Sequence, residues 1–524
     1  MATKTTHPSL FSIILLSVGT MVGSGWLFAC YYASKEAGPL SIFSWIVGAV
    51  LMLLMALLLC ELTIKFPKRN GLFTNLISLS HNTHIGFILS LGSWLLGLVV
   101  VSSEAIATVQ YLSGLKWPLL HHLFTNDHLT LSGIIFSIFF MILYMILNFW
   151  GVQLMAKANN VVTIIKILIP FFVIIVFAWA VFPLHGTNYS LHQHMAGIQK
   201  AQSLFSTIIN SGIFYSFFGF QAAASFASEL RNPERSLPIA LISSIIIVLV
   251  MYLALQVVFI GVLPTDMLNG GWAALNMQSP LAQLSTLLGL NFLTILLYVD
   301  SAISPSGTGI VYLGVTARIF NEMVKDGQMP ESLGTRESGR EFSRASLIIS
   351  VVISSIAILF FNNWQLIASL MTTFIVLSCL GLPIGHARLN VQSKNFFSKR
   401  FIPFPQFFSL FLFLVLSYLL LISGVKNLIA AAAMQWVFYI IYAMTKGKQQ
   451  ENLSFATIFQ SAWSLLGYLL IVPAFAVVQR YAGGGIIFYA SFFIVMIGAY
   501  YVLVRQKDYS PQAAGWSGAV QEQA

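Results

Sequence analysis

Residues 17–28, SVGTMVGSGWLF, lie in the middle of the first long apolar run of the chain, residues 10–33. A membrane helix normally satisfies every backbone hydrogen-bonding group internally, so three glycines at mid-depth favour an opening in the helix. An opened helix presents free amides at the N-terminus of its second half, where the helix dipole attracts an anion such as a carboxylate. The alternative is that these small residues only allow a neighbouring helix to pack closely.

The composition places the chain in a membrane. Of 524 residues, 58% are hydrophobic and 8% are charged, whereas about 25% of the residues of a soluble globular protein are charged. We therefore predict an all-α, polytopic membrane protein, and we interpret the first apolar run as a retained span rather than a signal peptide. The cysteines Cys30, Cys60 and Cys379 show no CxxC spacing and indicate neither a metal site nor a redox site.

Runs of about 20 apolar residues are long enough to cross a bilayer. The chain contains fourteen such runs, which predicts about 14 transmembrane helices. They lie near residues 10–33, 40–64, 84–112, 130–150, 158–182, 203–228, 237–263, 289–317, 345–361, 364–387, 403–422, 425–444, 457–478 and 484–504. The last residues, 505–524, are expected to form a disordered cytoplasmic tail.

The basic residues predict the orientation. Of the 26 Lys and Arg residues, twenty lie in the loops on the side of both termini, five lie in the opposite loops, and Lys166 lies inside a span. Because basic loops stay in the cytoplasm, we predict that both termini are cytoplasmic. The net charge of +10 is explained by this asymmetry and implies no nucleic-acid partner.

The sixth apolar run, like the first, is interrupted by glycine and polar residues. Residues 214–221, FYSFFGFQ, place a glycine and polar residues in its middle. Interrupted spans at positions one and six are typical of transporters built from two inverted repeats, with a binding site at the bilayer midplane. We therefore predict a first repeat in residues 1–182, a second repeat in residues 203–388 and additional helices in residues 402–504.

Four stretches, in this order and spacing, resemble the amino acid/polyamine/organocation (APC) permeases. They are GTMVGSGWLF (19–28), KANNVVTIIKILIP (157–170), FYSFFGFQAAASFASELRNPERSLPIAL (214–241) and DSAISPSGTGIVYLGVTARIFNEMVKDGQMP (300–330). Within this family, YYASKEAGPLSIFSWIVGAV, LNFWGVQLMAKANNVVTIIK and DSAISPSGTG are similar to segments of bacterial aspartate–proton symporters. The sequence departs from many permeases at Gln221, where they carry an acidic residue.

The resemblance implies a five-plus-five inverted repeat of the leucine-transporter type, with four further helices outside it. It implies that the substrate carboxylate lies against amides of the first interrupted span, and that its ammonium faces free carbonyls of the sixth. Phe220 is a candidate aromatic gate. The residues assigned in this way to substrate binding are Val22, Gly23, Ser24, Gly25, Tyr215, Ser216, Phe217, Gly219 and Phe220.

Lys166 is the one basic residue well inside a predicted span. A charge at the bilayer centre costs at least about 2.5–3.5 kcal/mol on insertion scales, so its position needs a reason. In proton-coupled members of the family, a lysine at the matching place lies between the first and eighth helices, where sodium-coupled relatives hold an ion. Burial disfavours the ammonium and would allow it to lose and regain a proton during transport. The alternative is a permanently charged lysine paired with Asp300 or Glu104.

Glu104 and Asp300 are the carboxylates deepest in apolar surroundings. Each could pair with Lys166, line the pocket or carry a proton, and the sequence does not choose between these roles. We assign Glu104 to the substrate-binding set, and Asp300 with Lys166 to proton coupling. Glu61 and Glu229 lie near basic residues at span ends, where we expect solvated pairing. We expect no proton relay through histidine.

These observations predict a proton-coupled symporter that imports an amino acid, with aspartate or glutamate implied by the resemblance. Ionised Glu104 and Asp300 would repel such a substrate, so a permease for neutral or cationic amino acids stays open, as does an exchanger of the same fold. The sequence shows no HExxH, GxSxG, P-loop or Cys/His cluster, which argues against an enzyme. The longest loop, residues 319–343, is too short for a sensor. The expected partners are an amino acid, protons and lipid, without a cofactor or metal.

Overall fold

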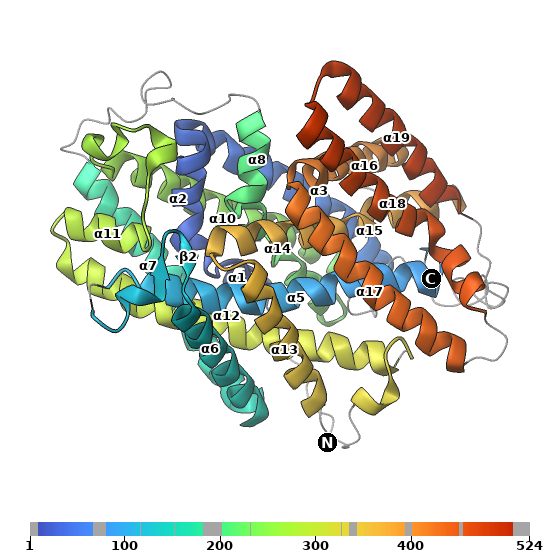
Figure 1. The fold of residues 1–524 in the computed structure, drawn as a ribbon, viewed down its shortest axis with the longest axis horizontal. Helices are drawn as coiled ribbons and strands as arrows, with labels where there is room; N and C mark the ends of the chain where they lie inside the picture. The colour runs from blue at the N-terminus through green and yellow to red at the C-terminus, as the bar shows by residue number, and fades with distance from the viewer. Residues whose placement is uncertain are drawn as a thin grey trace.

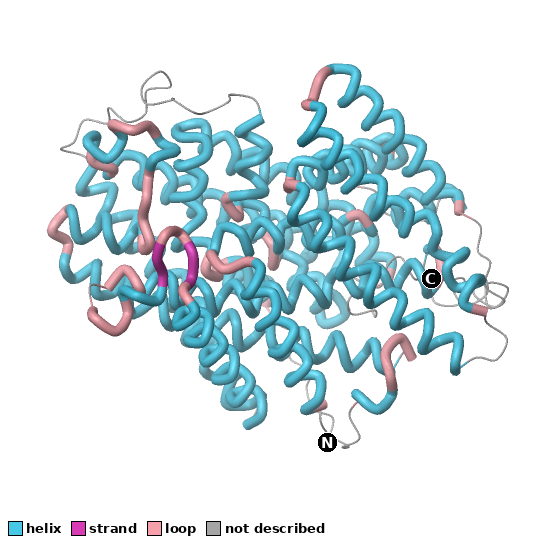
Figure 2. The backbone as a smooth tube through the Cα atoms, viewed as in Figure 1, coloured by secondary structure: helices cyan, strands magenta, loops and turns pink. Residues whose placement is uncertain are grey.

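Helices make up nearly all of the chain in the computed structural model, which describes residues 9–66, 80–115, 117–150, 152–181, 202–230, 232–325, 327–334, 343–392, 401–449 and 454–506 (Figure 2). Among these residues, one short hairpin pairs strand β1 (Phe124–Thr125) with strand β2 (His128–Leu129). Its turn residues Asn126 and Asp127 both have positive φ, a conformation that Asn and Asp tolerate better than most residues.

The helices of the two predicted repeats range from 4 to 35 residues in length. The first set is α1 (Leu10–Met21), α2 (Gly25–Ala37), α3 (Ser41–Lys65), α5 (Thr83–Leu112), α6 (Leu131–Trp150) and α7 (Val152–Val181). The second set is α8 (Gln202–Asn210), α9 (Ile213–Ser216), the 3-10 helix η5 (Phe220–Glu229), α10 (Pro233–Val262), α11 (Pro280–Leu287), α12 (Asn291–Lys325), α13 (Arg344–Phe360), α14 (Trp364–Cys379) and α15 (Gly381–Gln392).

Four further helices follow, α16 (Pro405–Ile422), α17 (Val425–Gln449), α18 (Phe455–Ala482) and α19 (Ile486–Arg505). They pack on one another and lie together on one side of the molecule, coloured orange to red in Figure 1. The last described residues are Arg505 and Gln506, so the predicted disordered tail lies almost entirely outside the described residues.

Within the described residues, nine helical segments are long and apolar enough to cross a membrane. They are Gly25–Lys65, Thr83–Leu112, Leu131–Phe149, Pro233–Val262, Trp364–Val391, Pro405–Ile422, Val425–Lys446, Phe455–Ala482 and Ile486–Arg505. Four shorter apolar helices are Leu10–Met21, Ile164–Ala180, Ile213–Ala224 and Arg344–Phe360. The chain is therefore an integral membrane protein, while the number of fourteen spans stays a prediction.

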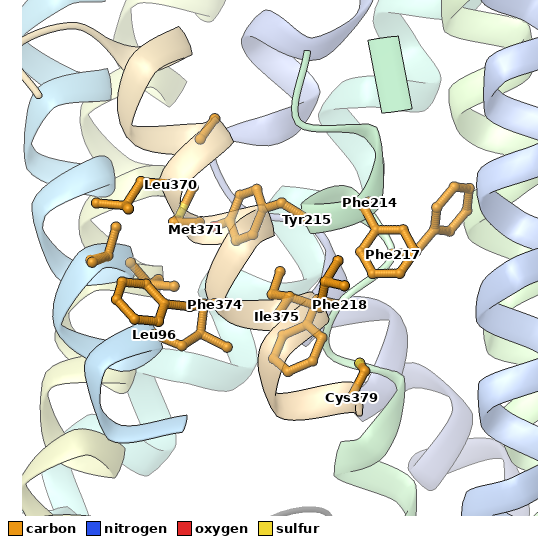
Figure 3. Packing of buried hydrophobic residues seen from close by; sticks show 14 of the residues in the cluster. Leu96, Phe214, Tyr215, Phe217, Phe218, Leu370, Met371, Phe374, Ile375 and Cys379 are labelled. Atoms are coloured by element: carbon orange, nitrogen blue, oxygen red, sulfur yellow. The ribbon is translucent and has the colours of Figure 1, made fainter. Parts of the chain in front are cut away.

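The centre of the molecule is built on α5 and α14. Helix α5 is buried along almost its whole length and packs against α12 and α14 (Figure 1). The aromatic side chains of Tyr215 and Phe218 lie close to the α14 residues Met371 and Ile375, respectively (Figure 3). The two interrupted regions are thus held in the interior rather than at the lipid surface.

The expectation of solvated pairing for Glu61 is wrong. Glu61, near the end of α3, is 2% exposed and pairs with the fully buried His386 of α15, with 2.8 Å between Oε2 and Nε2. Its Oε1 accepts hydrogen bonds from the backbone amides of Phe401 at 2.6 Å and Ile402 at 2.9 Å. The chain just before α16 folds over the end of α3, which removes from water a carboxylate that the span boundary placed at the interface. The side chain of Glu229 lies outside the described residues.

Replacing Glu61 with alanine is expected to destabilise the protein by about 3–5 kcal/mol, because it leaves His386 and two amides without their buried partner. Thermal melting of the detergent-purified protein measures this. The matched control is Glu331→Ala, which removes an exposed carboxylate and should change stability by less than about 0.5 kcal/mol. Equal melting temperatures for the two variants would contradict the structural role of Glu61.

Candidate functional site

The first apolar run is interrupted at its glycines, as predicted. Helix α1 ends at Met21, Val22 is extended with φ −91° and ψ 91°, and α2 begins at Gly25. Val22 and Ser24 are fully buried. We call Val22–Ser24 the first break. It lies in the protein interior, where backbone groups need partners other than water.

The sixth run is interrupted as well. Helix α9 ends at Ser216 and η5 begins at Phe220, so that Phe217–Gly219 form a second break. Gly219 has a φ of +138°, a conformation that only glycine adopts readily. Its amide donates to Oε1 of Gln221 at 2.9 Å, so the residue that departs from the family pattern satisfies the backbone of the break.

The two breaks touch each other. The hydroxyl of Thr20 at the end of α1 lies 3.0 Å from the carbonyl oxygen of Gly219 and shares its one hydrogen between this oxygen and the Ser17 carbonyl oxygen at 2.8 Å. A Cβ atom on Gly219 would lie 2.8 Å from the carbonyl carbon of Thr20 and 2.9 Å from the amide of Met21. On the other side of the first break, a Cβ on Gly25 would lie 2.6 Å from the hydroxyl of Ser216. Glycine is therefore needed at both positions for the close approach of the two breaks. The alternative considered from the sequence, that these small residues allow close packing, thus also holds.

Replacing Gly219 with alanine should lower transport about tenfold or more. The added carbon would meet backbone atoms that cannot rotate away, and alanine held at this positive φ would be strained by about 1–3 kcal/mol. Transport per folded molecule in proteoliposomes measures it. Gly289→Ala is the matched control, since Gly289 also has a positive φ, +73°, but an added Cβ there would meet no described atom within 4 Å. Equal losses in both variants would assign the effect to backbone strain alone.

Glu104 of α5 binds the first break directly. Its Oε2 accepts a hydrogen bond from the Ser24 amide at 3.1 Å, and its Oε1 accepts from the Ser24 hydroxyl at 3.0 Å. Oε1 also accepts from the hydroxyl of Tyr215 at 2.5 Å, so groups from both interrupted helices meet at this carboxylate. We call these three donors, the Ser24 amide, the Ser24 hydroxyl and the Tyr215 hydroxyl, the carboxylate niche.

Trp364 fixes the direction of the hydrogen bonds in the niche. Its indole Nε1 donates to the Ser24 hydroxyl at 2.9 Å. Because an indole N–H can only donate, the Ser24 oxygen accepts this bond and its own hydrogen is free to point at Glu104. The Trp364 ring in turn stacks on Phe28, with 5.0 Å between centroids, and on Tyr32, with 5.6 Å between centroids. An aromatic stack thus holds the donor that orients Ser24.

Lys166 of α7 lies close to the same region. Its side chain is 5% exposed, and its ammonium donates to the hydroxyl of Thr308 on α12. The methyl group of Thr308 lies 3.5 Å from the position of a Cβ on Gly23. In the part of the chain that the structure describes, Lys166 forms no salt bridge with Glu104 or Asp300, although both carboxylates act on it electrostatically. Direct pairing, the structural alternative for Lys166, is therefore absent in this conformation.

Asp300 of α12 is 1% exposed, and neither of its carboxyl oxygens has a hydrogen-bond partner among the described residues. The indole N–H of Trp26, which interacts with this carboxyl group, also lacks a bond of normal geometry to any of them. A buried carboxyl group without partners is costly, and intramembrane acidic residues are typical of ion or proton pathways. Asp300 is therefore a functional candidate that does not share the niche of Glu104.

The remaining predicted residues surround the second break. Tyr215, Ser216 and Phe217 are buried, and the Phe217 ring packs edge-on against Trp45 with 5.8 Å between centroids. Phe220 is fully buried, and its role as a gate stays a prediction. The sequence alone does not indicate Trp364 or Thr308 as site residues, and it does not connect Glu104 with Ser24. Within the described residues, no group of three or more His, Cys, Asp or Glu side chains could hold a metal ion.

Two broken helices that meet around buried charged groups in an integral membrane protein define a transporter. The sequence model of the family described as "Amino acid permease" matches residues 9–445, and the chain belongs to this family. The protein is therefore an amino acid permease and not an enzyme.

Relatives of known function agree with the family. The chain is 35% identical to the glutamate/serine transporter AimA of Bacillus subtilis over 390 residues, which cover 74% of this chain and 72% of that protein. It is 30% identical to the aspartate-proton symporter of the same organism over 483 residues, 91% of each. A manganese transporter of Eremococcus coleocola has a similar fold, with a TM-score of 0.51 at 13% identity over 95% of this chain and 97% of that one.

Proposed function

We propose that the protein is a proton-coupled symporter that imports an amino acid, with aspartate or glutamate as the first candidates. The observation that carries the proposal is the carboxylate niche, because the backbone and hydroxyl donors at the first break already hold a carboxylate, that of Glu104. The α-carboxylate of an amino acid has the same chemistry and suits the same donors. Its ammonium would face the carbonyls of Tyr215, Ser216 and Phe217 at the end of α9, although the Tyr215 carbonyl already accepts a hydrogen bond from the Phe218 amide at 2.8 Å.

Lys166 and Asp300 are the proposed proton-coupling residues. Lys166 is buried and bonded to a neutral hydroxyl, not to a carboxylate, so its charge can change without breaking an ion pair. Asp300 lies near enough to act on it electrostatically, and its carboxyl oxygens accept no hydrogen bond from the described residues. A relative that is named an aspartate-proton symporter supports coupling to protons.

The proposed architecture is a five-plus-five inverted repeat followed by four helices, about 14 spans in total. It would lie in the inner membrane of a bacterium with both termini in the cytoplasm. The positions of the two breaks, in the first and sixth apolar runs, support the repeat. The bias of basic residues supports the orientation.

A second candidate is a permease for a small neutral amino acid. It is favoured by the two buried carboxylates, Glu104 and Asp300, which would repel the second carboxylate of aspartate. One relative is named a glutamate/serine transporter, so both kinds of substrate occur among similar proteins.

Uptake into proteoliposomes tests the proposal. Radiolabelled aspartate, glutamate, serine, a larger neutral amino acid and arginine would be offered with and without an inward proton gradient, and half of the vesicles would be preloaded with unlabelled amino acid. Gradient-driven accumulation in vesicles that were not preloaded supports symport and identifies the substrate. Uptake only into preloaded vesicles, indifferent to the gradient, would make the protein an exchanger.

A further inference from the structure

The carboxylate niche is filled by a side chain of the protein itself. We infer that Glu104 is a tethered competitor of the substrate carboxylate, which holds the niche when no amino acid is bound and which the substrate displaces. This inference rests on the proposed function, since it names the residue that sets the affinity of the proposed substrate site. It makes Glu104 a determinant of affinity rather than a contact to the bound substrate.

The niche is built to be occupied by an anion. Ser24 supplies an amide and a hydroxyl, and Tyr215 supplies a second hydroxyl, all directed at one carboxylate. Because Trp364 donates to the Ser24 oxygen, the hydroxyl hydrogen cannot serve that neighbour and remains directed into the niche. Buried donors without an acceptor are unfavourable, so a departing Glu104 has to be replaced by another acceptor. The substrate carboxylate is such a replacement.

The niche has room for one carboxylate at a time. A Cβ atom on Gly23 would already lie 3.1 Å from Oε1 of Glu104 and 3.0 Å from the Tyr215 hydroxyl. Two carboxylates on the same donors would also repel each other. Binding of Glu104 and of the substrate to the niche is therefore mutually exclusive.

Glu104, which is fully buried in the niche, would leave it by rotation of its side chain. It projects from the middle of α5, a continuous helix, and its side chain can rotate about its own torsions. Lys166 is the cation that acts on it electrostatically, which gives the displaced carboxylate a favourable direction. Displacement by substrate would then bring the negative charge of Glu104 nearer to Lys166, the proposed proton site. Substrate binding would thereby be linked to the protonation of Lys166.

A tethered competitor lowers the apparent affinity of the substrate by the fraction of molecules whose niche is open. Glu104→Ala removes the competitor, and Glu104→Gln weakens it because a neutral amide is a poorer partner for three donors. We expect the dissociation constant of the substrate to fall about tenfold or more in the alanine variant, with glutamine in between. If Glu104 instead held the substrate ammonium, both variants would bind more weakly than the wild type.

Acetate serves as a probe of the niche that does not depend on transport. With the side chain of Glu104 removed, free acetate can occupy the niche, so millimolar sodium acetate should raise the melting temperature of Glu104→Ala. It should not raise that of the wild type, because the attached Glu104 carboxylate has a far higher effective concentration at the niche than acetate has. Sodium chloride at equal ionic strength and the exposed-site variant Glu331→Ala are the controls. Equal effects of acetate on wild type and Glu104→Ala, or no effect on either, would overturn the inference.

The two measurements separate this inference from the proposed function. Amino acid binding by the wild type that weakens in both the alanine and glutamine variants would overturn the competitor role and leave the transport function standing. Acetate that stabilises Glu104→Ala, with no amino acid bound by any variant, would support an exchangeable carboxylate in the niche and overturn the proposed substrate. If Glu104→Ala does not fold, the affinity of Glu104→Gln decides, because a lower affinity than that of the wild type contradicts the competitor.

Discussion

Replacement of Gly23 with leucine is expected to abolish amino acid binding. Gly23 lies between Val22 and Ser24, and even a single added carbon would lie 3.0 Å from the Tyr215 hydroxyl and 3.1 Å from Oε1 of Glu104. The branched side chain of leucine would therefore fill the space in front of the carboxylate niche. We expect substrate affinity to fall at least a hundredfold, roughly 2.7 kcal/mol.

Equilibrium binding of radiolabelled substrate to the purified protein measures the effect of Gly23→Leu. Gly498→Leu is the matched control, because Gly498 lies on α19, where an added Cβ has no described atom within 4 Å. The control variant should bind like the wild type. Unchanged affinity in Gly23→Leu would return the glycines of the first break to a packing role only.

Replacement of Lys166 with alanine should abolish uptake driven by a proton gradient while substrate binding stays measurable. The ammonium of Lys166 contacts the hydroxyl of Thr308 and is not part of the carboxylate niche, so its loss leaves the binding groups in place. Gradient-driven accumulation should fall at least about tenfold, whereas exchange of labelled for unlabelled substrate should persist.

Lys166→Arg separates proton transfer from a merely structural charge. Arginine keeps the positive charge but does not lose its proton in proteins, so it should fail in coupling just as alanine does. Restoration of gradient-driven uptake by arginine would show that a fixed charge is sufficient. Uptake that still follows the gradient in Lys166→Ala would remove Lys166 from the coupling mechanism altogether.

The interruptions were predictable because they depend on local sequence. Glycines at 23, 25 and 219 weaken a membrane helix wherever it packs, and the structure shows the helices ending at Met21 and at Ser216. The burial of Lys166 could be predicted for the same kind of reason, since an apolar run of this length has to cross the bilayer.

The contacts between distant helices could not be predicted. Glu104 is a lone carboxylate in the third apolar run, and nothing in its neighbours indicates that the Ser24 amide lies 3.1 Å away. Trp364 follows a helix N-cap at Asn363, a position that predicts where a helix starts but not what its indole contacts. These contacts depend on how helices cross in three dimensions.

Glu61 was predicted to be exposed to solvent, but it is buried. Its nearness to basic residues at a span end is typical of the membrane surface, and the sequence therefore predicted solvent exposure. The backbone amides of Phe401 and Ile402 and the ring of His386 remove it from water. A span boundary predicts depth along the membrane normal, but it does not predict which part of the chain covers that end of the helix.

The most direct test of the proposed symport is proton entry caused by substrate. Proteoliposomes that contain the protein and a trapped pH-sensitive dye would receive external amino acid at equal internal and external pH. We predict that the interior acidifies with the wild type, that the change is absent with Lys166→Ala, and that it requires the amino acid that is taken up. Uptake of labelled amino acid by the wild type without any change in internal pH would contradict proton-coupled symport.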